Sequence, residues 1–157
     1  MNKIFQILSV FIILLAIISS SLGLFYKTDG QSFDFINQYG GIVKIYGNGI
    51  YKNDSYFMAS IFKGTDCTIL FLAVPLLIIA LILNIKNDTV KTKLLLTAII
   101  ALFVYYSASI SFGVVYNVLH LIYIALFSCA IFALIIGLAI IAIYYEIKLF
   151  KNIQGNT

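Results

Sequence analysis

Four long apolar runs constrain this chain more than any other feature of its sequence. They cover residues 4–25, 65–85, 94–112 and 119–145. About 20 apolar residues in a helix are enough to cross the roughly 30 Å hydrocarbon core of a bilayer, so each run predicts one membrane-spanning helix. The sequence therefore predicts an all-α membrane fold, with four transmembrane helices in a single integral membrane domain over residues 1–157.

The composition indicates the same class of protein. Hydrophobic residues make up 62% of the chain and charged residues 10%, whereas soluble domains usually contain roughly 45–50% apolar and about 25% charged residues. The net charge of +4 comes from lysines at the ends of the apolar runs and in the segment between the first two. Lysines at such positions set orientation in a bilayer. The bilayer is the expected partner, and nucleic acid is not.

The first apolar run has two interpretations. Lys3 precedes it and the small residues Ser19–Ser21 lie near its end, which is the pattern of a cleaved signal peptide. The run is longer than the apolar core of about 7–15 residues that signal peptides carry. We therefore interpret it as an uncleaved membrane helix, with cleavage as the alternative.

Residues 26–64 form the sizeable polar part of the chain and are expected outside the membrane. Within them, Gly40-Gly41 and the Gly47–Gly49 run bracket a β-branched and aromatic stretch, residues 42–46. Glycine accepts the backbone conformations that tight turns need, and β-branched residues favour strands. The pattern predicts a small β-hairpin.

A short helix is expected after the hairpin. Asp54 or Ser55 can cap its first turn, and Gly64 is a suitable residue to end it. Its largely apolar composition predicts that it lies at the membrane interface. Thr65 then caps the second spanning helix, which places Asp66 in a first turn, where the helix dipole favours a carboxylate.

Two features of the spanning helices concern their packing. Pro75 lies near the middle of the second helix and predicts a kink. In the fourth helix, small residues recur at every fourth position and predict close approach to another helix, within the chain or in a partner or homo-oligomer. These residues are Ala125, Cys129, Ala133 and Gly137.

The lysines predict the orientation. The short segments on the side of the termini carry Lys3, Lys86, Lys91, Lys93, Lys148 and Lys151, and the opposite side carries Lys27, Lys44, Lys52 and Lys63. Lysines in short loops favour the cytoplasmic side. We expect a multi-pass protein of the cell (plasma) membrane with both termini in the cytoplasm.

This topology brings the candidate site residues to one outer face. Residues 26–64 and the turn at 113–118 meet there. The candidates for catalysis are Asp54, Asp66 and His120, and those for ligand binding are Tyr51, Ser55, Tyr116 and Asn117. A structural role is the competing interpretation, because capping explains several of them and a single His without a nearby carboxylate does not make a metal site. We expect Asp66 to contact backbone amides or the 40–55 segment rather than His120. No metal or cofactor is expected.

The stretch from Gly47 to Leu76 resembles a segment of an uncharacterised family of polytopic prokaryotic membrane proteins. The resemblance lies in G-x-G-x-Y-x-x-D-S, then G-x-D, then P-L, here Gly47, Gly49, Tyr51, Asp54, Ser55, Gly64, Asp66, Pro75 and Leu76. It implies a prokaryotic cell membrane and no particular activity. Members of that family are longer and have more helices, so this chain would be a short or truncated member.

The sequence leaves three classes of function open. The first is a non-enzymatic four-helix protein of the cell envelope that binds a partner protein, a small ligand or a lipid through its outer segment. The second is a membrane-embedded enzyme of the outer leaflet that uses the acidic candidates. The third is an oligomeric pore or carrier subunit. The spanning runs have no ionisable residue near their centres, where coupled transporters usually keep one.

The two cysteines provide a test of orientation. Cys67 lies near the outer end of the second helix and Cys129 lies deep in the fourth, so they are not expected to form a disulfide. A membrane-impermeant thiol reagent added to intact cells should label Cys67 and miss Cys129. Labelling of Cys67 only after the membrane is opened would contradict the orientation.

Overall fold

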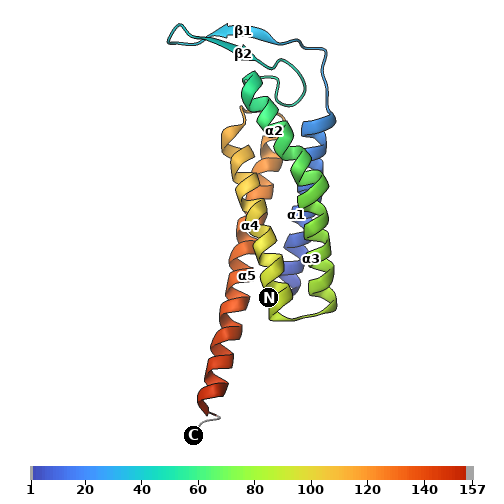
Figure 1. Cartoon of the computed structure of the whole chain (residues 1–157), viewed down its shortest axis with the longest axis vertical. Coiled ribbons are helices and arrows are strands. Elements are labelled where there is room, and N and C mark those ends of the chain that lie inside the picture. The colour runs from blue at the N-terminus through green and yellow to red at the C-terminus, as the bar shows by residue number, and fades with distance from the viewer. Residues whose placement is uncertain (1, 155–157) are drawn as a thin grey trace.

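The computed structural model of the chain describes the backbone of residues 2–154 and the side chains of residues 2–147. It is a bundle of long helices with a small sheet across one end (Figure 1). The elements are α1 (Asn2–Phe25), β1 (Phe33–Ile36), β2 (Ile42–Ile45), α2 (Tyr56–Thr68), the π-helical turn η1 (Ile69–Ala73), α3 (Val74–Lys86), α4 (Val90–Gly113) and α5 (His120–Gln154).

Four helical stretches in the described residues are long and apolar enough to span a membrane. They are Asn2–Phe25, Tyr56–Lys86, Val90–Gly113 and His120–Ile147. This confirms the predicted number of spanning helices. The two ends of the chain lie at the same end of the bundle, and α5 continues well beyond the other helices (Figure 1). We call this the terminus end, and the end with the sheet the outer end.

The predicted hairpin is present. β1 and β2 pair antiparallel, with Phe33 opposite Ile45 and Ile36 opposite Ile42. Gly40 has φ +78°, a conformation that favours glycine, and it lies in the turn between the strands. The glycines and the β-branched stretch therefore located β2, whereas β1 was not singled out from the sequence.

The predicted start of the second spanning helix is wrong. Ser55 does cap a helix, since its hydroxyl accepts a hydrogen bond from the backbone N–H of Met58. That helix continues through Gly64 and Thr65 and leads without interruption into η1 and α3. Gly64 lacks the positive φ of a helix-ending glycine, and a glycine inside a helix only weakens it by about 1 kcal/mol. There is no separate interfacial helix, and the hydroxyl of Thr65 bonds to the carbonyl of Ile61 instead of capping.

The helices pack through residues spaced alternately three and four apart. The buried positions are Phe5, Ser9, Ile12, Ala16, Ser19 and Gly23 in α1, and Tyr123, Leu126, Ala130, Ala133, Gly137 and Ile140 in α5. This is the spacing of coiled coils, in which one seam of each helix stays against its neighbours. α4 packs against both α5 and α3, and α1 lies against α5 (Figure 1).

The π-helical turn η1 resets this spacing in the second spanning helix. The buried positions run from Ala59, Phe62 and Asp66 in α2 to Ile69 and Ala73 at the two ends of η1. A new series then starts at Val74 in α3 and continues with Leu77, Leu81 and Asn84. The backbone N–H of Val74 bonds to the carbonyl of Ile69, one residue further back than in an α-helix. Pro75 follows directly, and its ring cannot fit against the carbonyl four residues earlier in a regular helix. The wider turn is how the helix accommodates this proline.

The small residues of the fourth helix do not act as one stripe. Ala133 and Gly137 are buried inside the chain, and a side chain at Gly137 would run into Thr97 and Phe5. Ala125 is exposed. A spacing of four residues drifts around a helix that has 3.6 residues per turn, so the outer half of the stripe turns away from the bundle. Contact with a partner or a second copy through these residues stays a prediction, and Ala133 and Gly137 already serve packing within the chain.

Replacing Gly137 by Leu should destabilise the bundle, because the new side chain has no space beside Phe5 and Thr97. Overpacking of this kind typically costs about 1–3 kcal/mol. The measurement is thermal unfolding in detergent. Ala125→Leu is the matched control, since it adds the same bulk at an exposed position of the same helix. A similar loss for both variants would contradict this packing.

Candidate functional site

The carboxylate of Asp66 is the centre of a buried polar cluster at the outer end of the bundle. Its side chain is fully buried, at 0% exposure. The Tyr51 hydroxyl donates to Oδ2 at 2.5 Å, and the Tyr106 hydroxyl donates to Oδ1 at 2.8 Å. Ser19 Oγ lies 3.3 Å from the Tyr106 hydroxyl oxygen. Both carboxylate oxygens therefore have a partner, one from the loop before α2 and one from α4, and Ser19 of α1 extends the cluster through Tyr106.

The local sequence explains how these groups come so close. Gly23 of α1 lies against the cluster, and a Cβ at this position would overlap the Asp66 carboxylate and the Tyr51 hydroxyl. The Tyr51 ring stacks on Phe62 of α2, with ring centroids 5.5 Å apart. The turn that carries Tyr51 is closed by a backbone hydrogen bond from Asp54 N–H to the Tyr51 carbonyl. Glycine on one side and an aromatic stack on the other fix the tyrosine over the carboxylate.

Tyr51 lies in the loop before the second helix, and its environment keeps its hydroxyl protonated. Burial is the main cause that raises the pKa of Tyr51 far above its ordinary value, and the nearby Asp66 carboxylate raises it further. A phenolate beside a carboxylate would place two negative charges in a site with little water. Tyr51 is therefore a permanent hydrogen-bond donor to Asp66, with the role of holding the loop to the bundle.

Asp54 makes a second link between the outer segments. Its side chain is 2% exposed, and Oδ1 accepts a hydrogen bond from the backbone N–H of Val115 at 2.9 Å. Burial raises the pKa of the Asp54 carboxyl, and the hydrogen bond from Val115 opposes part of that shift. The bond joins the loop before α2 to the connection between α4 and α5.

Several buried polar atoms near these links have no hydrogen-bond partner in the described part of the chain. They include Oδ2 of Asp54, Nδ2 of Asn117, Nδ1 of His120 and the Tyr123 hydroxyl. The Tyr123 hydroxyl lies near the side chains of Asn117 and Tyr51. Polar side chains therefore lead from Asn117 through Tyr123 and Tyr51 to Asp66. Buried polar atoms without a hydrogen-bond partner are uncommon in proteins, so this group of side chains is a candidate for contact with a ligand.

An open groove lies beside this cluster and has a volume of about 390 Å³. It is lined by Tyr26, Thr28, Gly49, Ile50, Lys52, Asn53, Tyr116, Asn117 and Val118. Two of the predicted ligand-binding residues, Tyr116 and Asn117, lie in it. Tyr51 belongs to the Asp66 cluster instead, and Ser55 caps α2.

The three candidates for catalysis, two aspartates and one histidine, do not line this groove. Asp54, Asp66 and His120 are absent from its lining. The His120 ring instead packs against Tyr116, with ring centroids 5.0 Å apart. As expected, Asp66 contacts the 40–55 segment, through Tyr51; it does not bond to backbone amides at a helix start, because the helix begins ten residues earlier. Among the described residues, no three His, Cys, Asp or Glu side chains form a group that could hold a metal ion.

Sequence reasoning missed Tyr106, Ser19 and Gly23. All three lie inside apolar runs, where a tyrosine, a serine or a glycine has many ordinary roles. A signal was present in Asp66 itself, because a carboxylate next to an apolar run needs donors if it is buried. Tyr106 carries a hydroxyl in the run that packs next to it.

The comparisons with protein-family models, curated proteins and solved structures found no match for this chain. The likeness of residues 47–76 to an uncharacterised membrane family therefore stays a prediction.

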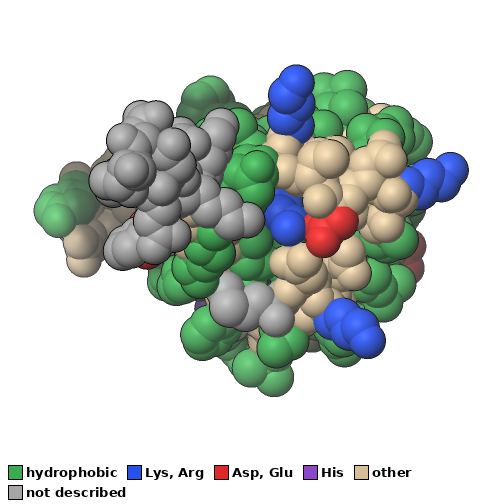
Figure 2. All heavy atoms as spheres, turned by 90° about the horizontal axis from the view of Figure 1, so that it is seen from below, with side chains coloured by type: hydrophobic (Ala, Val, Ile, Leu, Met, Phe, Trp, Pro, Cys, Tyr) green, Lys and Arg blue, Asp and Glu red, His purple; other side chains and the backbone are tan. Residues whose placement is uncertain are grey.

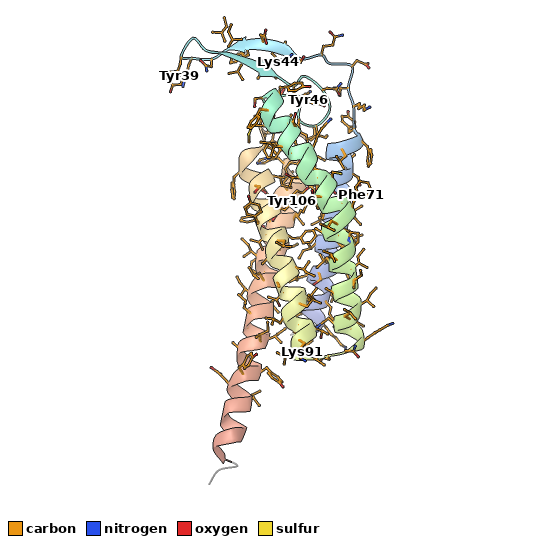
Figure 3. All side chains as sticks on the ribbon, viewed as in Figure 1. Tyr39, Lys44, Tyr46, Phe71, Lys91 and Tyr106 are labelled. Atoms are coloured by element: carbon orange, nitrogen blue, oxygen red, sulfur yellow. The ribbon has the colours of Figure 1, made fainter. Side chains whose placement is uncertain are left out.

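Tyr51→Phe should destabilise the chain, because it removes one donor from a fully buried carboxylate. Leaving a buried charged group short of a partner costs about 1–3 kcal/mol, or more. Thermal unfolding in detergent measures the loss. Tyr39→Phe is the matched control, since Tyr39 is 86% exposed in the hairpin turn (Figure 3). Equal stability of the two variants would show that the bond to Asp66 does not hold the outer segment.

Proposed function

We propose that this chain is a non-enzymatic, multi-pass protein of a prokaryotic cell membrane that binds a partner protein through its outer hairpin. Both termini lie in the cytoplasm. The four apolar helices and the lysines at the terminus end support this placement. The surface of the hairpin is the observation that carries the proposal.

The hairpin exposes large apolar side chains. Phe33 and Phe35 are each 55% exposed, and Ile36, Ile42 and Tyr39 are more exposed still, up to 86%. Clusters of exposed apolar side chains on a water-facing surface commonly mark interaction sites. A shallow depression of about 230 Å³ lies on this surface, lined by Phe33, Phe35, Ile45 and Asn53. It has the size to receive one apolar side chain of a partner.

The height of the hairpin favours a protein over lipid as its partner. From Lys86 to Asp66 the helix rises ~30 Å at 1.5 Å per residue, which matches the hydrocarbon core. The ten residues from Asp66 back to Tyr56 add about 15 Å along the helix axis. The hairpin lies beyond the start of α2 (Figure 1), so in the proposed placement its apolar side chains face water beyond the headgroups.

Side-chain contacts hold the hairpin on α2. The Lys63 ammonium donates to the Tyr46 hydroxyl at 2.6 Å, and the Tyr46 ring packs on Tyr56 with centroids 5.7 Å apart. The Lys44 ammonium lies over the Tyr56 ring, 5.5 Å from its centroid; Figure 3 shows Lys44 and Tyr46 at this end of the hairpin. The proximal part of the hairpin is therefore fixed, and the distal part, with Phe35 and Tyr39, projects away from the bundle. A preorganised surface loses less entropy on binding than a mobile one.

A small ligand in the outer groove is the second candidate function. The observation that favours it is Nδ2 of Asn117, a buried donor beside the groove that has no hydrogen-bond partner among the described residues. Lys52 is the charged residue of the lining, so the groove suits a small anionic compound with hydroxyl groups.

The other classes of function have less support. An enzyme that used Asp66 would need its carboxylate to reach a substrate, whereas this side chain is fully buried and does not line the outer groove. A pore through one chain would need a polar path, whereas the bundle interior is filled by fully buried Leu96, Ile100 and Phe103.

A photo-crosslinking amino acid at Phe35 tests the proposed surface in intact membranes. We expect a crosslinked product of one defined mass from this position. Phe71 is the control, because it is 65% exposed on the apolar part of the spanning helix Tyr56–Lys86 (Figure 3) and faces lipid in the proposed placement. The Phe35 product should disappear when Phe33→Asp is added.

The mass of the product separates the outcomes. A product at twice the 17.5 kDa chain mass would identify the partner as a second copy. No protein product from Phe35, or equal products from Phe35 and Phe71, would contradict the proposal.

The thiol-labelling test of orientation is sharper with a cysteine at Asn53 in a Cys67→Ser background than with Cys67 itself. Cys67 lies next to Asp66, well below the start of α2, whereas Asn53 is exposed in the loop before α2.

A further inference from the structure

A basic pocket lies at the terminus end of the bundle, away from the outer site. Its volume is about 620 Å³, and its lining residues are Asp88, Thr89, Val90, Lys91, Lys93, Tyr144 and Tyr145. Its lining residues come from the start of α4 with the turn before it and from α5; α5 continues beyond the bundle at this end (Figure 1). The function proposed above makes no use of it.

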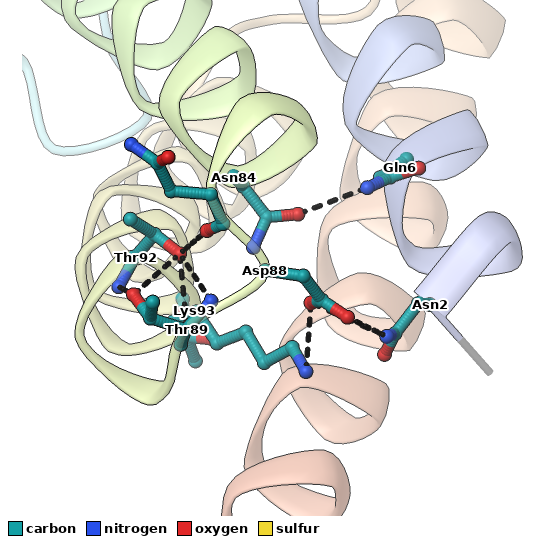
Figure 4. Close-up of polar contacts among 9 residues, drawn as sticks. Asn2, Gln6, Asn84, Asp88, Thr89, Thr92 and Lys93 are labelled. Carbon is teal, nitrogen blue, oxygen red and sulfur yellow. Dashed lines mark hydrogen bonds and ion pairs between the residues drawn. The ribbon is translucent and has the colours of Figure 1, made fainter.

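The charges around this pocket leave a lysine available. Asp88 is paired with Lys93, with Nζ and Oδ1 2.9 Å apart, and it also accepts a hydrogen bond from Asn2 at 3.1 Å (Figure 4). Lys91 is exposed and makes no salt bridge in the described part of the chain. The end-on view shows several basic side chains around a polar centre at this end (Figure 2). The pocket therefore has a net positive lining.

The pocket also lies at a defined depth. Lys91 and Lys93 directly precede the apolar run that begins at Leu94, so they mark the boundary of the hydrocarbon core. Tyr144 and Tyr145 are about half exposed, at 47% and 53%. Tyrosines are enriched where the core meets the headgroups, with the ring in the apolar layer and the hydroxyl toward water. All four side chains therefore lie at headgroup level if the bundle spans the bilayer.

We propose that this pocket binds the phosphate group of an anionic phospholipid of the cytoplasmic leaflet. Lys91 supplies the free positive charge, Lys93 adds a second ammonium that is shared with Asp88, and the two tyrosine hydroxyls can donate hydrogen bonds. Basic pockets between helices on this side of a membrane suit anionic headgroups. The inference rests on the proposed membrane placement but not on the partner surface of the hairpin. Free phosphate offers the same chemistry, and the experiment separates the two sources.

The test uses the full chain in dodecyl maltoside micelles. Native mass spectrometry measures its affinity for phosphatidylglycerol, with phosphatidylcholine as the uncharged reference. We expect binding of phosphatidylglycerol to exceed that of phosphatidylcholine, and Lys91→Gln to weaken it about fivefold, because one lysine near a membrane surface contributes on the order of that factor. Lys86→Gln is the matched control: Lys86 is exposed at the same end and does not line the pocket. It should weaken the affinity clearly less than Lys91→Gln, because Lys86 lies outside the pocket.

Inorganic phosphate forms the other arm. Failure of millimolar phosphate to displace the lipid supports a lipid headgroup as the ligand. Displacement with the same dependence on Lys91 supports the site and assigns it to free phosphate. Equal weakening by Lys86→Gln and Lys91→Gln, or no preference for phosphatidylglycerol, overturns the proposal. None of these results depends on the Phe35 crosslink, so the two proposals can fail separately.

Discussion

The arrangement of the outer end depends on one buried carboxylate. Asp66 has no exposed surface, and burying an ionisable group among apolar helices is unfavourable unless hydrogen bonds replace water. Two tyrosine hydroxyls do this, one from the loop at Tyr51 and one from α4 at Tyr106. The third contribution is the absence of a side chain at Gly23, which lets α1 approach. One carboxylate thus ties a loop and three helices together, and the loop cannot leave without exposing it.

The contact between Tyr51 and Asp66 also determines the position of the rest of the outer segment. Because Tyr51 is fixed, the chain on both sides of it is fixed too, and the strand β2 leads into it through Tyr46 and its contacts with α2. Asp54 adds a bond to the connection between α4 and α5. The hairpin is a small sheet that would be marginal in water alone, yet it can hold exposed phenylalanines in place because its base is anchored. The hydrogen bond from Tyr51 to Asp66 therefore both holds the outer segment on the bundle and keeps the exposed apolar side chains of the hairpin in a fixed position.

The sequence predicted the elements whose cause is local. Apolar runs located the four helices, glycines and β-branched residues indicated the hairpin, and the cap of α2 was narrowed to Asp54 or Ser55, of which the structure shows Ser55. The prediction from sequence failed where the outcome depended on contacts between distant residues. Gly64 and Thr65 have the composition of a helix end followed by a new helix start, but the packing of Phe62 and Asp66 keeps the helix continuous. The pairing of Asp66 with Tyr106 joins residues 40 positions apart. The π-helical turn before Pro75 could not be read from spacing alone either.

The structure also changes what the charges at the two ends mean. By sequence, the four lysines of the outer side are balanced by four acids, but Asp54 and Asp66 are buried in hydrogen bonds, so only Asp29 and Asp34 remain exposed there. The exposed surface of the outer segment is thus more positively charged than the equal numbers of lysines and acids in its sequence indicate. This does not weaken the argument for the proposed orientation, because the positive-inside rule counts lysines in short loops and long segments cross the membrane largely regardless of charge. At the terminus end the tight turn before α4 keeps Lys91 exposed and Asp88 engaged with Lys93. The charges that would orient the chain are therefore also the ones free to meet a phosphate.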